Sequence, residues 1–126
     1  MKYCISCGNG TDALTLALKV WNIGAGDAVF VPDFTFFSSA EVISLEGATP
    51  VFVDVDRDTF NMDASDLERK IACTVEEGRL TPKVIVTVDL FGSASSFSSS
   101  FTGLPIIKAL DAATSTIAAS MSHFNT

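Results

Sequence analysis

The chain has 126 residues, of which 48% are hydrophobic and 18% are charged, so it is too apolar for a disordered protein and long enough to bury one core. Its net charge is −7, and its Lys and Arg residues are not clustered, which argues against a nucleic-acid partner. No apolar run reaches the about 18 residues of a membrane helix, no export signal is recognisable, and three cysteines do not suit a disulfide scaffold. We therefore expect a cytoplasmic protein without a membrane partner.

The first predicted element is a short apolar strand at residues 2–6, which runs into a glycine turn. A helix should begin at this turn, with Asn9 or Thr11 as its cap and Asp12 in its first turn, where the helix dipole favours a negative charge. Its apolar face ends before Gly24.

The next predicted elements are a strand at residues 28–31, a helix that starts at Thr35 or Ser38 and ends at Gly47, and a strand at residues 49–54. Both strands are continuous apolar runs, which are typical of strands buried on both faces. We therefore expect both to be buried.

The second half of the chain continues the alternation. A loop at residues 56–61 precedes a charged helix at residues 63–71, whose first residue is a capping aspartate. Further buried strands are predicted at residues 83–88 and 104–107. Residues 93–102 stand apart, because they contain six serines and no apolar helical face where a crossover helix would be expected.

Strands that alternate with helices of this length predict βαβ units. We expect an α/β fold, namely a three-layer α/β/α sandwich with a mostly parallel sheet. Residues 1–126 should form one domain, in which residues 93–102 are irregular.

Two cysteines, Cys4 and Cys7, stand three apart in the stretch CISC. A zinc site of this kind needs a second pair of ligands, and the remaining candidates, Cys73 and His123, stand alone, so we expect no metal site. Two interpretations stay open: structural apolar cysteines, or a thiol redox site near a helix start.

The turn Gly8-Asn-Gly-Thr-Asp12 combines flexible glycines with a helix start. Its backbone N–H groups, the positive end of the helix dipole and the Thr11 hydroxyl would together suit a phosphate monoester. An ordinary capped strand–helix turn is the alternative interpretation.

Several longer segments occur in a characteristic order: GNGTDALTLAL, VFVPDFTFFSSAEVISLEGATPVFVDVD and VIVTVDLFG. In these segments the chain resembles the DegT/StrS family of sugar aminotransferases, which are pyridoxal-phosphate (PLP) enzymes of the aspartate-aminotransferase fold type. The likeness runs from Tyr3 to Gly92. It implies an internal fragment of the large domain of such an enzyme.

The resemblance implies roles for particular residues. Gly10, Thr11 and Asp12 would hold the cofactor's phosphate. Phe36, the last residue of the segment that begins at Pro32, would lie flat on the pyridine ring.

The resemblance also implies a carboxylate beside the pyridine nitrogen. Asp111 takes this place when the segment Asp111-Ala-Ala113 is matched to the family. If the strand that follows Gly103 is aligned with the family from Gly103 onward instead, the family's aspartate position falls on Ala109. The carboxylate is then absent.

The family's Schiff-base lysine follows the aspartate in a context that this chain does not contain. The lysines present are Lys2, Lys19, Lys70, Lys83 and Lys108, and none has that context. The resemblance therefore implies no catalytic residue here, and we expect no transamination by these residues alone.

The implied family reaction moves an amino group from glutamate to the keto-sugar of a nucleotide sugar, in a homo-oligomer whose subunits share active sites. Two other functions stay open. One is a non-catalytic, stand-alone oligomer with at most weak phosphate or PLP binding. The other is a thiol redox protein that uses Cys4 and Cys7.

Overall fold

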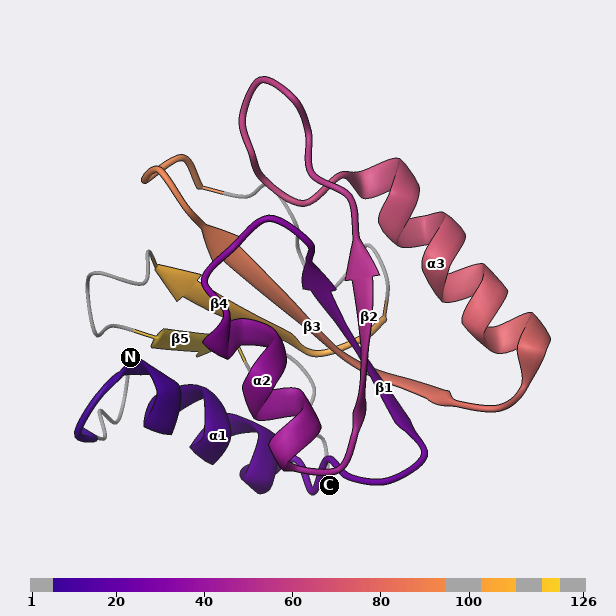
Figure 1. The fold of residues 1–126 in the computed structure, drawn as a ribbon, viewed down its shortest axis with the longest axis horizontal. Helices are drawn as coiled ribbons and strands as arrows, with labels where there is room; N and C mark the ends of the chain where they lie inside the picture. Colours follow the sequence, from indigo (N-terminus) through magenta and orange to yellow (C-terminus); the bar gives the residue numbers. More distant parts are fainter. Residues whose placement is uncertain (1–5, 95–102, 111–116, 121–126) are drawn as a thin grey trace.

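A computed structural model describes residues 6–94, 103–110 and 117–120 of the chain (Figure 1). The helices of this part are α1 (Gly10–Val20), α2 (Ser38–Leu45) and α3 (Ala64–Glu77). The strands are β1 (Asp27–Pro32), β2 (Thr49–Val53), β3 (Thr81–Asp89), β4 (Ile106–Leu110) and β5 (Ile117–Ser120).

The strands form one sheet in the order β2-β1-β3-β4-β5. β1 pairs in parallel with both β2 and β3, and β3 pairs in parallel with β4. β5 runs antiparallel to β4 and was not predicted from the sequence. The expectation of a mostly parallel sheet is confirmed.

Helices cover both faces of the sheet (Figure 1). Alternate residues of β1 point to opposite faces, so Val29 and Val31 pack under α1 and α2, whereas Ala28 and Phe30 pack under α3. The α1–α2 side of the core consists of Leu14, Leu18, Ile23, Val29, Val31, Val42, Ile43, Ala48, Val84, Val86 and Ile107. The α3 side consists of Ala28, Phe30, Val53, Met62, Leu67, Ile85 and Ile106. The predicted three-layer α/β/α sandwich is thus confirmed.

Side-chain caps mark the start of two of the three described helices, α1 and α3. Of the two candidate caps for α1, Asn9 is the one that the structure uses. α2 starts at Ser38 rather than Thr35, and its cap residue Phe37 makes no side-chain capping bond. α3 is capped by Asp63, as predicted, but continues beyond residue 71 to Glu77.

The prediction that the strand at residues 49–54 is buried is wrong. β2 lies at the edge of the sheet, only Val53 is buried in it, and Phe52 is 49% exposed. An apolar run indicates that a strand prefers burial. It does not indicate the strand's place in the sheet, which depends on the strands with which it pairs.

Some sequence predictions fall outside the described part of the chain. They include residues 2–5 of the first predicted strand and residues 95–102 of the serine-rich segment. The predicted strand at residues 104–107 begins at Ile106. No helix within the described ranges is long and apolar enough to cross a membrane.

Candidate functional site

The carboxyl ends of the parallel strands form the edge at which open α/β sheets usually bind ligands. The loops after β1 and β2 both lie at this edge (Figure 1). α1 leads into β1 through a short turn at residues 21–26, so α1 runs antiparallel to the strand and its N-terminus faces the carboxyl edge.

The N-terminus of α1 is organised by a side-chain cap. Asn9 Oδ1 accepts a hydrogen bond from the Asp12 N–H at 2.8 Å, and Asn9 Nδ2 donates to Asp12 Oδ2 at 3.0 Å. Among the described residues, the N–H groups of Gly10 and Thr11 have no hydrogen-bond acceptor. These free donors stand at the positive end of the helix dipole, where an anion is favoured.

The side chains around this turn leave room for a ligand. The Thr15 hydroxyl donates to the Thr11 carbonyl oxygen at 3.0 Å, whereas the Thr11 hydroxyl has no partner within the described ranges. A Cβ atom added to Gly10 would meet nothing within 4 Å. A Cβ atom at Gly8 would lie 3.3 Å from Asp12 Oδ2, so the glycine there lets the Asp12 carboxylate approach the backbone.

The segment that precedes α2 is held at both ends. The Asp33 N–H donates to the Val53 carbonyl oxygen at 2.9 Å, and the Ser39 N–H donates to the Phe36 carbonyl oxygen at 3.1 Å. The Phe36 side chain is 58% exposed, and the buried Thr35 hydroxyl has no partner among the described residues. An unpartnered buried hydroxyl is unfavourable by about 1–3 kcal/mol, which a bound ligand or water would offset.

Asp111 lies outside the described residues, but the strand beside it is placed. Leu110, the last residue of β4, pairs with Asp89, the last residue of β3. Asp89 is itself only 6% exposed. It is a buried carboxylate at the carboxyl edge that the sequence analysis overlooked, although an aspartate that ends an apolar strand could have signalled it.

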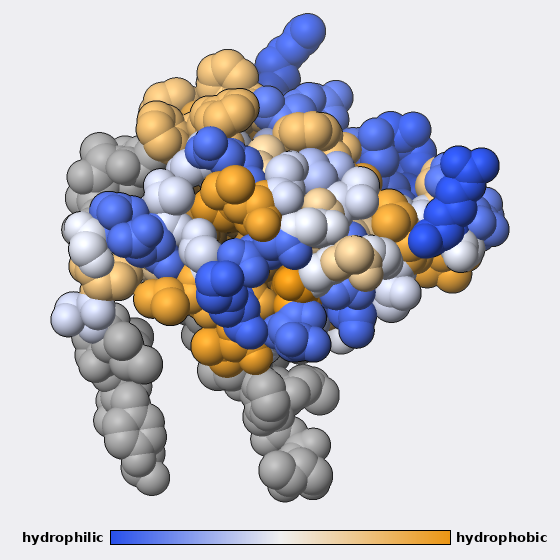
Figure 2. Space-filling model, turned by 60° about the horizontal axis from the view of Figure 1, so that its bottom comes forward, coloured by the Kyte–Doolittle hydropathy of each residue, from blue (hydrophilic) through white to orange (hydrophobic). Residues whose placement is uncertain are grey.

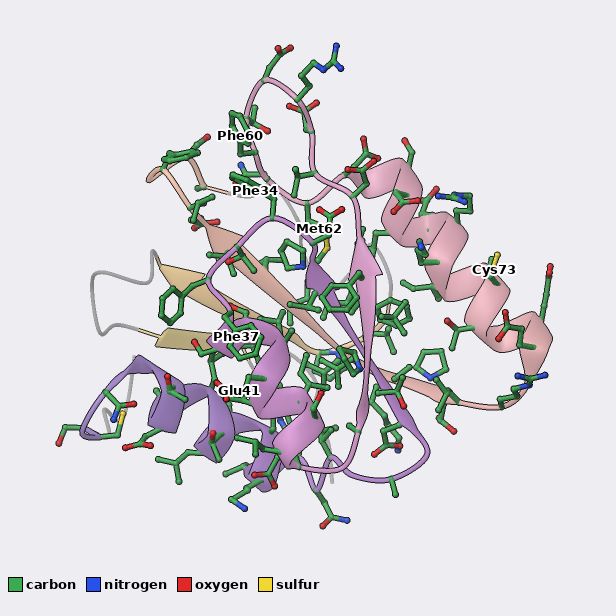
Figure 3. The ribbon with its side chains drawn as sticks, viewed as in Figure 1. Phe34, Phe37, Glu41, Phe60, Met62 and Cys73 are labelled. Carbon is green, nitrogen blue, oxygen red and sulfur yellow. The ribbon has the colours of Figure 1, made fainter. Side chains whose placement is uncertain are left out.

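An aromatic cluster at the same edge was also overlooked. The ring centroids of Phe34 and Phe60 lie 5.4 Å apart, as do those of Phe60 and Phe91. Figure 3 shows Phe34 and Phe60 together beyond the ends of β1 and β2. The three rings come from separate loops, so no local pattern could have revealed their contact.

The cysteines that can be placed are on the surface. Cys7 is exposed, and its Sγ donates to the Asn9 carbonyl oxygen at 3.4 Å. Cys73 is exposed on α3 (Figure 3). Cys7 is therefore not the buried apolar residue that one interpretation of the CISC stretch requires, and Cys4 lies outside the described residues. Within the described ranges, no three His, Cys, Asp or Glu side chains group as a metal site.

These residues fit a phosphorylated, flat heterocycle such as PLP. The free donors of Gly10 and Thr11 suit its phosphate, and the open space at Gly10 admits it. The exposed ring of Phe36 offers a face for stacking.

Comparison with known proteins identifies the family of the chain. Residues 1–118 match the model of the DegT/DnrJ/EryC1/StrS aminotransferase family. The chain is 42% identical over 114 residues to UDP-2-acetamido-2-deoxy-3-oxo-D-glucuronate aminotransferase of Pseudomonas aeruginosa, covering 85% of this chain and 29% of that protein. It is 47% identical over 94 residues to GDP-perosamine synthase of Caulobacter vibrioides, covering 73% of this chain and 23% of that protein.

Solved structures of aminotransferases also superpose on this chain. A DegT DnrJ EryC1 StrS aminotransferase from Brucella abortus superposes with a TM-score of 0.78 at 54% identity, covering 81% of this chain and 29% of that one. The PMP form of the putative sugar aminotransferase Spr1654 from Streptococcus pneumoniae gives a TM-score of 0.62 at 42% identity, covering 70% of this chain and 20% of that one. The chain thus spans less than a third of the length of these relatives. It belongs to the DegT/DnrJ/EryC1/StrS aminotransferase family.

Proposed function

We propose that this chain forms part of the cofactor-binding half of a PLP-dependent nucleotide-sugar aminotransferase. The observation that carries the proposal is the start of α1, where the Gly10 and Thr11 N–H groups and the Thr11 hydroxyl have no partner among the described residues. The relatives named above include enzymes of UDP- and GDP-linked sugars. A nucleotide sugar as amino acceptor and glutamate as amino donor are the substrates we propose for the whole enzyme.

When bound, PLP supplies an electron sink that stabilises the carbanion formed next to the transferred nitrogen. Gly10 and Thr11 would bind the phosphate, while Asp12, which is hydrogen-bonded to Asn9, would hold the turn in place. Phe36 would stack on the ring, which is worth about 0.5–1.5 kcal/mol beyond burial. Asp111 would keep the ring nitrogen protonated.

We further propose that these 126 residues do not transaminate by themselves. The reaction needs a lysine amine that bonds to the cofactor's aldehyde and moves the substrate proton. The five lysines of the chain do not stand in the family's sequence context for that group. PLP should therefore bind through its phosphate and ring without a covalent bond to lysine.

A PLP titration of the purified chain, followed by absorbance, tests both parts. Saturable binding that Thr11→Val weakens is the expected result. Thr15→Val is the matched control, because its hydroxyl bonds only to the Thr11 carbonyl within the described residues. Equal binding by wild type and Thr11→Val would contradict the phosphate site. Borohydride treatment and peptide mass spectrometry should find no single lysine labelled stoichiometrically by PLP, and stoichiometric labelling of one lysine would contradict the lack of a catalytic amine.

A second candidate function is that of a stand-alone oligomer without catalysis. It is favoured by exposed apolar residues on α1, on α2 and just before α2: Val20 is 66% exposed, Leu45 71% and Phe37 74%. Figure 2 shows hydrophobic residues at the surface among hydrophilic ones. Large apolar patches seldom stay uncovered on monomers. Light scattering that gives a monomer mass at micromolar concentration would rule this candidate out.

A further inference from the structure

Phe60 has a backbone conformation that is rare for a bulky residue. Its φ is +57°, in the left-handed region, where the Cβ atom of an L-residue crowds the following carbonyl oxygen. Glycine and asparagine adopt this conformation more readily than other residues do. A phenylalanine there is strained, and strained backbone positions concentrate at functional sites, where they orient a group. The strain at Phe60 therefore indicates a role beyond stability.

The loop that contains Phe60 is held in one shape by its own hydrogen bonds. The Asp56 N–H donates to the Asn61 carbonyl oxygen at 2.8 Å, and the Phe60 N–H donates to the Asp56 carbonyl oxygen at 2.9 Å. Asp56 Oδ1 also accepts from the Thr59 N–H at 2.8 Å and from the Asp58 N–H at 3.1 Å. These last bonds, led by that of the Thr59 N–H, lower the pKa of Asp56. The loop thus fixes the backbone on both sides of Phe60, as a strained residue requires.

The strained backbone places the Phe60 ring between two other aromatic rings (Figure 3). Its centroid lies 5.4 Å from that of Phe34, with the ring planes inclined at 41°, and 5.4 Å from that of Phe91, in an edge-to-face arrangement. Both separations lie within the about 4.5–7 Å of favourable aromatic pairs. Phe60 is 38% exposed and belongs to neither side of the core. Its ring therefore acts through these two contacts rather than by filling the core.

Phe34 stands two residues before Phe36 in the segment that joins β1 to α2. Hydrogen bonds of the Asp33 N–H and of the Phe36 carbonyl oxygen hold the two ends of this segment. Between them, Phe34 and Thr35 make no hydrogen bond with the described residues. The contact between the Phe34 and Phe60 rings therefore ties the middle of the segment to a rigid loop.

We propose that Phe60 is a positioning residue for Phe36. The rigid loop holds the Phe60 ring, the Phe60 ring holds Phe34, and the position of Phe34 sets the path of the backbone to Phe36. The Phe36 ring would thereby be kept in the orientation in which it stacks on the pyridine ring. This last step rests on the proposed function, whereas the effect of Phe60 on the segment does not.

Such positioning strengthens binding without a new contact to the ligand. A mobile side chain that must be ordered on binding lowers the affinity, because its lost freedom opposes association. Phe36 is 58% exposed, so packing by its neighbours restrains it only in part. A segment that the fold already holds in place avoids much of this loss, which gives the strain at Phe60 a physical purpose.

The first test is backbone ¹⁵N relaxation of the full chain without cofactor. Phe60→Asn removes the ring and suits the left-handed conformation, so the loop should keep its shape. It should lower the order parameters of Phe34, Thr35 and Phe36 to below about 0.6, the range of flexible backbone. Phe60→Tyr keeps the ring and should leave them unchanged. Phe91→Asn is the matched control, because Phe91 contacts Phe60 and makes no ring contact with Phe34 among the described residues.

Unchanged order parameters in Phe60→Asn, or an equal fall in Phe91→Asn, would overturn the positioning role. Circular dichroism would show whether each variant folds. Phe60→Leu, which keeps an apolar side chain without an aromatic ring, gives the same comparison if Phe60→Asn does not fold.

The second test measures PLP affinity by absorbance in a double-mutant cycle. Phe60→Asn should weaken binding by about two- to tenfold, the factor expected for the loss of one aromatic stack, whereas Phe60→Tyr should not. In a Phe36→Leu background, Phe60→Asn should have no further effect, because the ring that it positions is gone. The same loss in both backgrounds would mean a general structural role and would overturn the proposal. A wild-type chain that binds no PLP would contradict the proposed function alone, and the relaxation experiment would then decide the role of Phe60.

Discussion

Asn9 and Asp12 bind each other twice at the start of α1. The Asp12 N–H donates to Asn9 Oδ1 at 2.8 Å, and Asn9 Nδ2 donates to Asp12 Oδ2 at 3.0 Å. This reciprocal cap uses the Asp12 N–H and leaves those of Gly10 and Thr11 available at the helix end. The same local geometry therefore stabilises the helix and exposes its free donors.

Asn9→Ala should lower the free energy of unfolding by about 1 kcal/mol, because it removes the capping acceptor. Asn9→Ser is the control, since serine caps helices about as well as asparagine. Urea unfolding followed by circular dichroism would measure both variants. Equal stability of Asn9→Ala and Asn9→Ser would show that the cap contributes nothing.

Phe30→Ala should destabilise the chain by about 3–5 kcal/mol, because it opens a cavity beneath α3. The Phe30 side chain is fully buried in β1, whereas Phe52 in the neighbouring edge strand β2 is 49% exposed. Phe52→Ala should therefore lower the stability by only about 1 kcal/mol. Thermal or urea unfolding of the two variants gives the comparison, and similar losses would contradict the edge position of β2.

Acid should destabilise the chain partly through Asp66. The Asp54 N–H donates to Asp66 Oδ2 at 2.9 Å, and this bond, aided by Arg69, lowers the pKa of Asp66 although partial burial raises it. The folded pKa lies below the unfolded value of about 3.9, so the stabilisation is present above that pH and is lost as the pH falls through the folded pKa.

Asp66→Asn should therefore flatten the fall in unfolding free energy below about pH 4. Glu68→Gln removes one charge from the same helix and is the matched control. Urea unfolding at several pH values between neutrality and strong acid would measure the three profiles. A profile of Asp66→Asn that is as steep as that of the wild type would exclude this contribution.

Phe60→Ala should destabilise the chain more than Phe91→Ala. Phe60 is the central ring and contacts both Phe34 and Phe91, whereas Phe91 contacts Phe60. Each aromatic contact is worth about 0.5–1.5 kcal/mol beyond burial. Phe60 is also less exposed, at 38% against 68% for Phe91. The unfolding free energies of the two variants, measured in urea, test this prediction. A larger loss of unfolding free energy for Phe91→Ala than for Phe60→Ala would contradict it.

The local features of the site were predictable from sequence. The cap at Asn9, the cap at Asp63 and the glycine turn before α1 depend on hydrogen bonds between residues a few positions apart. Each uses residue types that are favoured at such positions. The cofactor roles of Phe36 and Asp111 came from the family resemblance and remain predictions.

Segment order and apolar periodicity thus sufficed for the α/β class and most element positions, because these depend on local hydrogen bonding and alternating burial. The family came from the resemblance of whole sequence segments. Only the tertiary structure decided that β2 is an edge strand, that β5 runs antiparallel, and that Phe34, Phe60 and Phe91 meet. It alone also brought the Asn61 side chain to the Ser93 carbonyl oxygen. These contacts join residues far apart in the chain, and the competition among burial partners that selects them leaves no signal in any short stretch.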